Sequence, residues 1–211
     1  MIHFSCTSFA RCARFGVMFA IVALASTSAI PQETAPPSAD SVHVIISTEL
    51  GDIEVELYAK AAPKTVENFL RYVDAKHYDA GRFHRTVTPI NQPDNKIKIE
   101  VIQAGVALEH AKADFAPIGL ERTSDTKLAH VDGAISMARD EPDTATSDFF
   151  ICIGDQKELD LGGKRNPDGQ GFAAFGKVTK GMEIVKKLQA APEKEQSLTP
   201  PIKIMRIVRK P

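Results

Sequence analysis

Residues 81–105 read GRFHRTVTPINQPDNKIKIEVIQAG, and this stretch decides how the fold is interpreted. Phe83–Val87 and Ile97–Gln103 are rich in aromatic and β-branched residues, whereas the segment between them is polar and interrupted by proline. This pattern predicts two neighbouring strands joined by a long loop. Arg85 and Gln103 lie on these strands at positions where a strand normally presents an apolar side chain. A cation and an amide at such positions indicate that the two residues belong to a functional site.

The rest of the chain also follows a two-residue hydrophobic period, which is typical of strands that bury one face. Val42–Thr48 and Ile53–Tyr58 are separated by a short turn and predict a hairpin. Four further strands with the same pattern are predicted at Gly133–Ala138, Phe149–Ile153, Phe172–Val178 and Ile202–Val208.

Two helices are predicted between the strands. The first begins at Pro63 and places Val66, Phe69 and Val73 on one apolar face. The second covers residues 181–189. Eight short strands with two isolated helices do not form an alternating series of strands and helices. The sequence therefore predicts a mainly β fold, namely a closed eight-stranded antiparallel β-barrel capped by two α-helices.

The N-terminal residues 1–29 have the pattern of a signal peptide. Two arginines precede the apolar stretch Phe15–Ala25, and small residues follow it before a possible cleavage point. The apolar stretch is shorter than the roughly 20 residues that a membrane-spanning helix needs, and a retained membrane anchor is the alternative. Residues 30–41 are rich in Pro, Ala and Ser and predict a flexible linker, so residues 42–211 are expected to form the folded domain.

Charge and cysteine content exclude several classes of protein. Removing Arg11 and Arg14 with the signal peptide from the 26 basic residues leaves 24 against 27 acidic residues, a net charge of −3. No basic surface for nucleic acid or anionic lipid is indicated. Of three cysteines, only Cys152 lies outside the signal peptide, and its isoleucine neighbours predict a buried apolar position without a disulfide. The histidines show no metal-ligand spacing, so neither a metal nor a cofactor is expected.

Hydrolytic chemistry is a weak alternative. Ser136, His84 and Asp148 could be combined into a triad on paper, but no nucleophile elbow surrounds Ser136. The LGGK segment at 161–164 lacks the hydroxyl residue and the helix of a phosphate-binding loop.

Five short blocks occur in a fixed order along the chain. They are FHR at 83–85, IQAG at 102–105, GAISMA at 133–138, SDFFI at 147–151 and FGKV at 175–178. Together with the opening hairpin and APKTVENF at 62–69, these blocks resemble the signatures of the cyclophilin-type peptidyl-prolyl cis/trans isomerases. The resemblance covers residues 42–208, and five ordered blocks are far more specific than one motif. It implies the cyclophilin-like barrel and catalysed rotation about X-Pro bonds without a cofactor.

The resemblance also implies roles for individual residues. Arg85 and Gln103 would be the catalytic pair, because a permanently charged guanidinium can stabilise a twisted amide while a glutamine holds it in place. The implied substrate-binding residues are His84, Val101, Ala138, Arg139, Phe150, Leu159 and Phe172. Val101, Phe150, Leu159 and Phe172 would form the apolar pocket for the proline ring, and Ala138 and Arg139 would offer backbone to the peptide.

The expected partners are proline-containing peptides and unfolded or folding client proteins, and neither nucleic acid nor membrane insertion after processing is expected. The protein is expected to be a monomer that is exported to the periplasm or secreted. An alternative function is a proline-peptide binding or chaperone module of the same fold with weak or absent turnover, which Glu100 and Arg139 would favour.

Several positions depart from the family's usual residues and put the pocket shape in question. Glu100 stands where a pocket phenylalanine is usual, Glu158 where a tryptophan is frequent, Arg139 for an asparagine, Phe172 for a histidine and Asp148 for a glutamine. Residues 89–98 and 161–171 form two extended loops, of which the first is expected to be a lid or merely a wider hairpin. These departures leave the catalytic pair intact but predict weaker cyclosporin-type inhibition.

Overall fold

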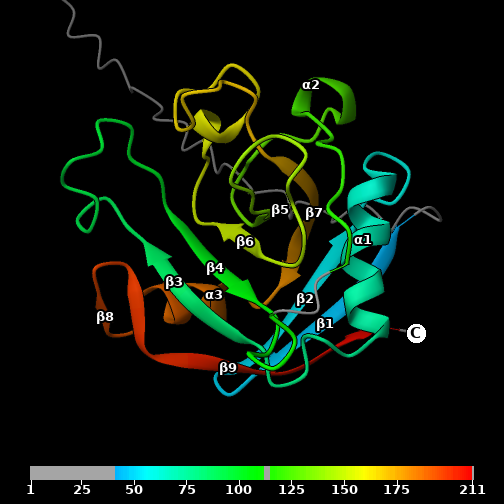
Figure 1. Cartoon of the computed structure of the whole chain (residues 1–211). Helices are drawn as coiled ribbons and strands as arrows, with labels where there is room; N and C mark the ends of the chain where they lie inside the picture. The colour runs from blue at the N-terminus through cyan, green and yellow to red at the C-terminus, as the bar shows by residue number, and fades with distance from the viewer. Residues whose placement is uncertain (1–40, 112–114, 211) are drawn as a thin grey trace, which may run out of the picture. The chain divides into compact units, whose positions relative to one another are not determined.

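The computed structural model describes residues 41–111 and 115–210, and its architecture is mainly β (Figure 1). Within these residues there are nine strands, three α-helices and one short 3-10 helix. The strands are β1 (Val42–Thr48), β2 (Gly51–Leu57), β3 (Arg82–Val87), β4 (Val101–Gly105), β5 (Ala134–Met137), β6 (Phe149–Cys152), β7 (Ala173–Lys180), β8 (Glu193–Lys194) and β9 (Ser197–Arg209). The helices are α1 (Pro63–Asp74), α2 (Thr123–Thr126) and α3 (Met182–Gln189), and the 3-10 helix is Lys157–Leu159.

Eight of the strands close into an antiparallel barrel, which confirms the predicted fold. The hydrogen-bonded order is β1-β2-β7-β5-β6-β4-β3-β9, and pairing of β1 with β9 completes the circle. The two-residue strand β8 pairs only with β9 and stands outside the circle. Closure gives each barrel strand a partner on both sides, which removes the exposed edges that favour aggregation.

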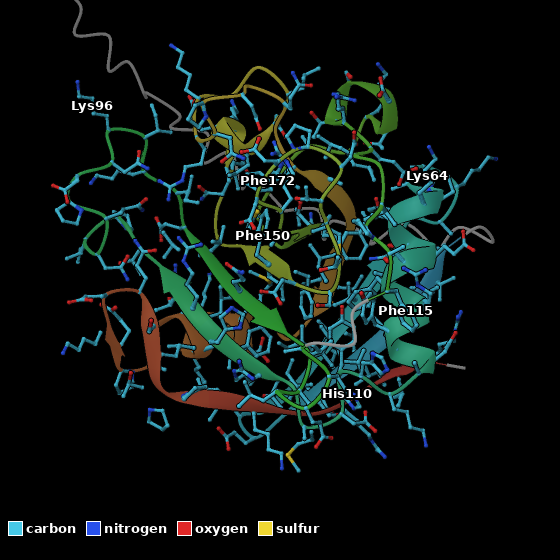
Figure 2. All side chains as sticks on the ribbon, in the orientation of Figure 1. Lys64, Lys96, His110, Phe115, Phe150 and Phe172 are labelled. Atoms are coloured by element: carbon cyan, nitrogen blue, oxygen red, sulfur yellow. The ribbon has the colours of Figure 1, made fainter. Side chains whose placement is uncertain are left out.

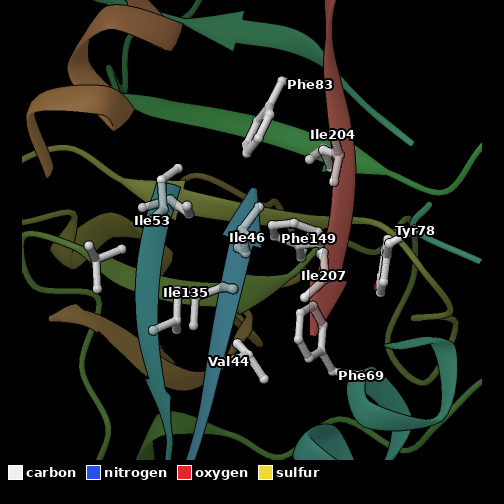
Figure 3. Close-up of a cluster of buried hydrophobic side chains, with 14 of the residues drawn as sticks. Val44, Ile46, Ile53, Phe69, Tyr78, Phe83, Ile135, Phe149, Ile204 and Ile207 are labelled. Atoms are coloured by element: carbon white, nitrogen blue, oxygen red, sulfur yellow. The ribbon is translucent and has the colours of Figure 1, made fainter. Parts of the chain in front are cut away.

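The main hydrophobic core fills the barrel interior. Ile46 of β1 is paired with Ile53 of β2, and both are fully buried, as is Val44 of β1 (Figure 3). Their neighbours in the sequence point outward, as the two-residue period predicts. Phe69 of α1 packs edge-on against Phe149 of β6, with ring centroids 5.4 Å apart. Aromatic edge-to-face contacts of this kind add to the stabilisation from burial alone.

The two predicted helices cover the barrel interior from opposite sides (Figure 1). Proline in the first turn of α1 fits the start of a helix, where its missing N–H has no intrahelical partner to lose. The apolar face of α1 joins the core near β7 and β9, whereas Ile184, Val185 and Leu188 of α3 join it near β2, β3 and β4. The single turn α2 is an addition that the hydrophobic pattern does not predict.

A second apolar cluster lies on the outer face of the wall formed by β3, β4, β5 and β6. Its buried members are Val87, Ile99, Val101, Ala134, Phe150, Cys152 and Leu159. On β6, Phe150 and Cys152 of this cluster alternate with Phe149 and Ile151 of the main core. The wall is therefore apolar on both faces here, and the partly buried Ala138 and Phe172 pack against the outer one.

Strand β4 begins later than the sequence predicts, at residue 101 instead of 97. Side chains bond to the backbone that precedes it: Gln92 Nε2 donates to the Ile99 carbonyl (2.6 Å), and Arg165 Nη1 donates to the Ile97 carbonyl (2.8 Å). These hydrogen bonds satisfy buried backbone groups without a strand ladder. The segment becomes a structured loop against the outer cluster.

The predicted signal peptide, residues 1–29, lies outside the described residues, as does all of the predicted linker except Ser41. In the ranges 41–111 and 115–210, none of the helices has both the length and the apolar character needed to cross a membrane.

Candidate active site

Arg85 and Gln103 lie opposite each other on β3 and β4 and are hydrogen-bonded. The Nη1 atom of Arg85 donates to Oε1 of Gln103 at 3.1 Å. The register shifts between Phe83 and Arg85, and such a bulge re-aims a side chain relative to the regular alternation. Burial lowers the pKa of Arg85, but a guanidinium remains charged at neutral pH. The predicted contact is therefore present.

A second amide holds Arg85 from another side, and sequence reasoning missed it. Oε1 of Gln196 accepts hydrogen bonds from both Nε (3.0 Å) and Nη2 (2.7 Å) of Arg85. The Gln196 backbone carbonyl accepts from the Thr86 N–H, and its Nε2 donates to the carbonyl of Asn91. The turn before β9 is thereby attached to β3. After these bonds, Nη1 and Nη2 of Arg85 each retain one N–H for another partner.

Gln103 is itself oriented by Asp148. Its Nε2 donates to Oδ2 of Asp148 at 2.9 Å, and the same oxygen lies 3.4 Å from Nε2 of His84. Gly105 makes this approach possible, because a Cβ at that position would collide with the Asp148 carboxylate. The Gln103 amide thus faces a cation with its oxygen and an anion with its nitrogen, which defines its orientation.

A cavity of about 440 Å³ opens beside Arg85 and Gln103. The residues predicted from the sequence that line it are Arg85, Val101, Gln103, Ala138, Arg139, Phe150, Leu159 and Phe172. His84 does not line it but borders a neighbouring cavity of about 170 Å³, together with Gly105 and Asp148.

The apolar wall of the cavity is formed around two aromatic rings. Phe150 and Phe172 meet edge to face, with centroids 5.4 Å apart and an interplanar angle of 89° (Figure 2). Leu159 is buried beside them. The backbone N–H of Ala138 donates to the carbonyl of Asp148, so this donor is already used within the protein. A ring-sized apolar group would contact surfaces of all three apolar residues.

Glu100 does not enter the cavity, and Ile99 lines it instead. Residues 99, 101 and 103 share one face because side chains alternate along an extended chain. The Glu100 carboxylate is on the other side, where Gln189 of α3 donates to it at 3.4 Å. Glu100 therefore does not interrupt the apolar wall of the cavity. Glu158 likewise is absent from the lining, and its carboxylate accepts from the backbone N–H of Lys164.

Arg139 uses its side chain to fix the second extended loop. Its side chain is 1% exposed, pairs with Asp168 through two hydrogen bonds of 2.7 and 3.1 Å, and donates twice to the Gly171 carbonyl. The guanidinium also lies 5.1 Å from the centre of the Phe172 ring. The ion pair lowers the pKa of the exposed Asp168 carboxyl. Arg139 therefore holds Phe172 and the loop at the rim.

Ser136 forms a contact that differs from the triad considered from the sequence. Its hydroxyl lies 3.0 Å from Nε2 of His130, and Nδ1 of His130 lies 2.7 Å from Asp160. Burial opposes ionisation of Asp160, but hydrogen bonds from His130 outweigh this effect and lower the Asp160 pKa. Ser136 is fully buried and His130 stacks against Phe150, so this group supports the floor of the cavity and offers no accessible nucleophile.

Cys152 is buried in the outer cluster, as the sequence predicts. Burial, and then the negative charges of Asp160 and Asp132, raise the pKa of its thiol. The thiolate is the reactive form of cysteine, so this side chain is inert.

The site thus presents a fixed cationic donor beside a cavity with one apolar wall. The chain matches the family model for cyclophilin type peptidyl-prolyl cis-trans isomerases over residues 43–209. It is 34% identical over 173 residues to peptidyl-prolyl cis-trans isomerase A of Dickeya dadantii, covering 82% of this chain and 83% of that protein. A Streptomyces antibioticus peptidyl-prolyl cis-trans isomerase is 37% identical over 145 residues, covering 67% and 80%.

Solved structures agree with these sequence comparisons. A cyclophilin type peptidyl-prolyl cis-trans isomerase of Cryptosporidium parvum, crystallised in the presence of the dipeptide Ala-Pro, superposes with a TM-score of 0.65 at 25% identity. The superposition covers 80% of this chain and 99% of that one. The chain belongs to the cyclophilin-type peptidyl-prolyl cis-trans isomerase family.

Proposed function

We propose that the domain rotates X-Pro peptide bonds during the folding of exported proteins, with Arg85 as the catalytic residue. The observation that carries this proposal is the Arg85 guanidinium, fixed between the amides of Gln103 and Gln196 at the edge of a cavity that has one apolar wall. Such a donor is preorganised, so it needs no rearrangement when the substrate reaches its transition state.

The chemistry follows from the electronic structure of the amide. Rotation about an X-Pro bond has a barrier of about 20 kcal/mol because the nitrogen lone pair is delocalised into the carbonyl. In the twisted state the lone pair is localised on nitrogen and can accept a hydrogen bond. The remaining N–H groups of Arg85 can donate to it, and this interaction is stronger in the twisted than in the planar state.

The apolar wall of the cavity holds the proline ring while the bond rotates. Phe150, Leu159 and Phe172 supply the apolar surface, and burial of a ring against them favours binding by about 25 cal/mol per Å² of area removed from water. The Cryptosporidium relative crystallised with Ala-Pro supports a proline ligand for this cavity. No covalent intermediate is needed, because no bond is broken.

A protease-coupled assay on a proline-containing tetrapeptide tests the proposal. We expect the cis to trans conversion to accelerate in proportion to protein concentration. Peptide binding without any acceleration would instead identify a proline-peptide binding or chaperone module.

Export is proposed from the sequence of residues 1–29. The clients would then be unfolded or folding proteins that pass through the periplasm or leave the cell, and the mature protein would act as a monomer. N-terminal sequencing of the protein recovered outside the cytoplasm should begin near Ile30. Recovery of membrane-bound protein that still starts at Met1 would contradict this part of the proposal.

Gln196 should act as a positioning residue for Arg85. Gln196→Ala removes the acceptor of two hydrogen bonds from the guanidinium, so we expect kcat to fall by about tenfold, about 1.4 kcal/mol, with little change in KM. Glu195→Ala is the matched control, since Glu195 is an exposed neighbour that also has a positive φ. Unchanged kcat in Gln196→Ala, or an equal loss in the control, would show that this contact is only structural.

A further inference from the structure

We propose that the site prefers peptides that carry an acidic side chain close to the proline, because the Arg165 guanidinium stands at the cavity without a carboxylate partner. Arg165 belongs to the second extended loop and lines the same cavity as Arg85. The inference rests on the proposed isomerase function and adds a substrate class to it.

The hydrogen bonds of Arg165 involve only neutral groups. Its Nη1 atom donates to Oε1 of Gln92 at 2.7 Å and to the carbonyl of Ile97 at 2.8 Å. Within residues 41–111 and 115–210, Arg165 forms no ion pair, and its Nε and Nη2 atoms have no hydrogen-bond partner. Arg139 lines the same cavity but differs, because it forms an ion pair with Asp168.

Neutral partners also fix the position of Arg165. Gln92 is 4% exposed and donates through Nε2 to the carbonyls of Thr88 (2.8 Å) and Ile99 (2.6 Å). Lys98 donates to the backbone carbonyl of Gln92. The loop at 89–98 is thus tied together internally and bonded to Arg165, so it supports the part of the second extended loop that lines the cavity. The cation is held in place before a substrate arrives.

Arg85 and Arg165 repel each other across the cavity. Burial lowers the pKa of Arg165, and the positive charge of Arg85 lowers it further. Arg85 is also held by amides alone, as described above. A carboxylate between or beside the two cations would be attracted by both and could accept from the open Nε and Nη2 donors of Arg165.

The opposite end of the cavity carries negative charge. Arg165 bonds to Ile97, which precedes β4. Asp148 lies beside the other end of β4, next to Gln103 and Gly105. Asp140 also lines the cavity, next to Arg139. An extended peptide would therefore meet a cation on one side of its proline and a carboxylate on the other. The preference for an acidic residue should hold on one side of the proline only.

Peptides that differ in one side chain test the inference directly. We would use N-acetylated, C-terminally amidated peptides. Glu, Gln or Lys is placed in turn at each of the two positions before proline and each of the two positions after it, so that only the charge of one side chain varies. Isomerisation is followed by NMR exchange, which avoids the sequence preference of a coupling protease. We expect kcat/KM to be about fivefold higher with Glu than with Gln at one side, and the ratio to shrink as salt rises.

Substitutions identify the residue responsible. Arg165→Gln should bring the Glu/Gln ratio close to one, because only the attraction of Arg85 remains, whereas Arg165→Lys should retain most of the ratio, since a lysine keeps the charge but not the planar fork. Lys164→Gln is the matched control: this exposed neighbouring cation does not line the cavity, and its loss should leave both the ratio and the basal rate unchanged.

The outcomes separate the inference from the function on which it rests. A ratio of one for the native protein at all four positions, or a ratio that survives Arg165→Gln, would overturn the charge preference. Absence of turnover with every peptide would overturn the isomerase function, and the peptide dissociation constants from the same titrations would then decide the charge preference by themselves.

Discussion

Replacing Arg85 with alanine is expected to lower kcat/KM for a proline peptide by about 100-fold, a loss of about 2.7 kcal/mol of transition-state stabilisation. The donors of Arg85 act mainly on the twisted amide, so their removal affects turnover more than binding. The affinity for the peptide should change much less, because the apolar surfaces of Phe150, Leu159 and Phe172 remain. NMR exchange measures the rate, and titration calorimetry measures the dissociation constant.

The geometry around Arg85 also predicts that lysine is a poor replacement. Three different nitrogen atoms of the guanidinium donate to the two glutamine amides, and an ammonium has only one nitrogen to place. Arg206→Ala, which removes an exposed arginine on β9, controls for the loss of a positive charge. If Arg85→Ala isomerises as fast as the native protein, or loses rate and affinity equally, Arg85 does not have the proposed role.

Replacing Phe150 with alanine should reduce both stability and peptide binding. The ring is 5% exposed and packs between His130 and Phe172, so its removal leaves a void in the outer cluster. Truncation of a buried phenylalanine costs about 3–5 kcal/mol of unfolding free energy. Urea unfolding measures this loss, and the peptide dissociation constant should rise in the fraction that remains folded.

Phe172→Ala is the matched variant for this prediction. Phe172 is only partly buried and packs on the outside of the same cluster. Its loss should weaken peptide binding while costing much less stability than the loss of Phe150. A Phe150→Ala protein that binds the peptide with native affinity would show that the ring is part of the core alone and does not contact the substrate.

The sequence predicts the barrel because its evidence is local and repeated. The two-residue period of Val42–Thr48 predicts a strand with one buried face, and the structure shows it. The structure also contains the predicted contact between Arg85 and Gln103. The boundary of β4 was wrong by four residues because side chains of Gln92 and Arg165 satisfy the preceding carbonyls. The two-residue hydrophobic period gives no indication of these side-chain hydrogen bonds to the backbone.

The missed site residues fall into two kinds. Ile99 could have been found, because residues 99, 101 and 103 must share a face if the chain is extended. Gln196 could not, since it lies 111 positions from Arg85 and reaches it only after the barrel closes. Arg165 also becomes part of the site through the packing of two loops, which have no periodic pattern.

The burial of Cys152 prevents this thiol from forming mixed disulfides with other proteins. In the proposed role, the protein would act in an oxidising compartment on clients whose own cysteines are not yet paired. An accessible thiol would be captured by such clients in mixed disulfides and would link the catalyst covalently to its substrates. Because the thiol is buried in the outer cluster and has a raised pKa, the proposed encounters with clients would stay reversible and would leave the client's cysteine pairing unaltered.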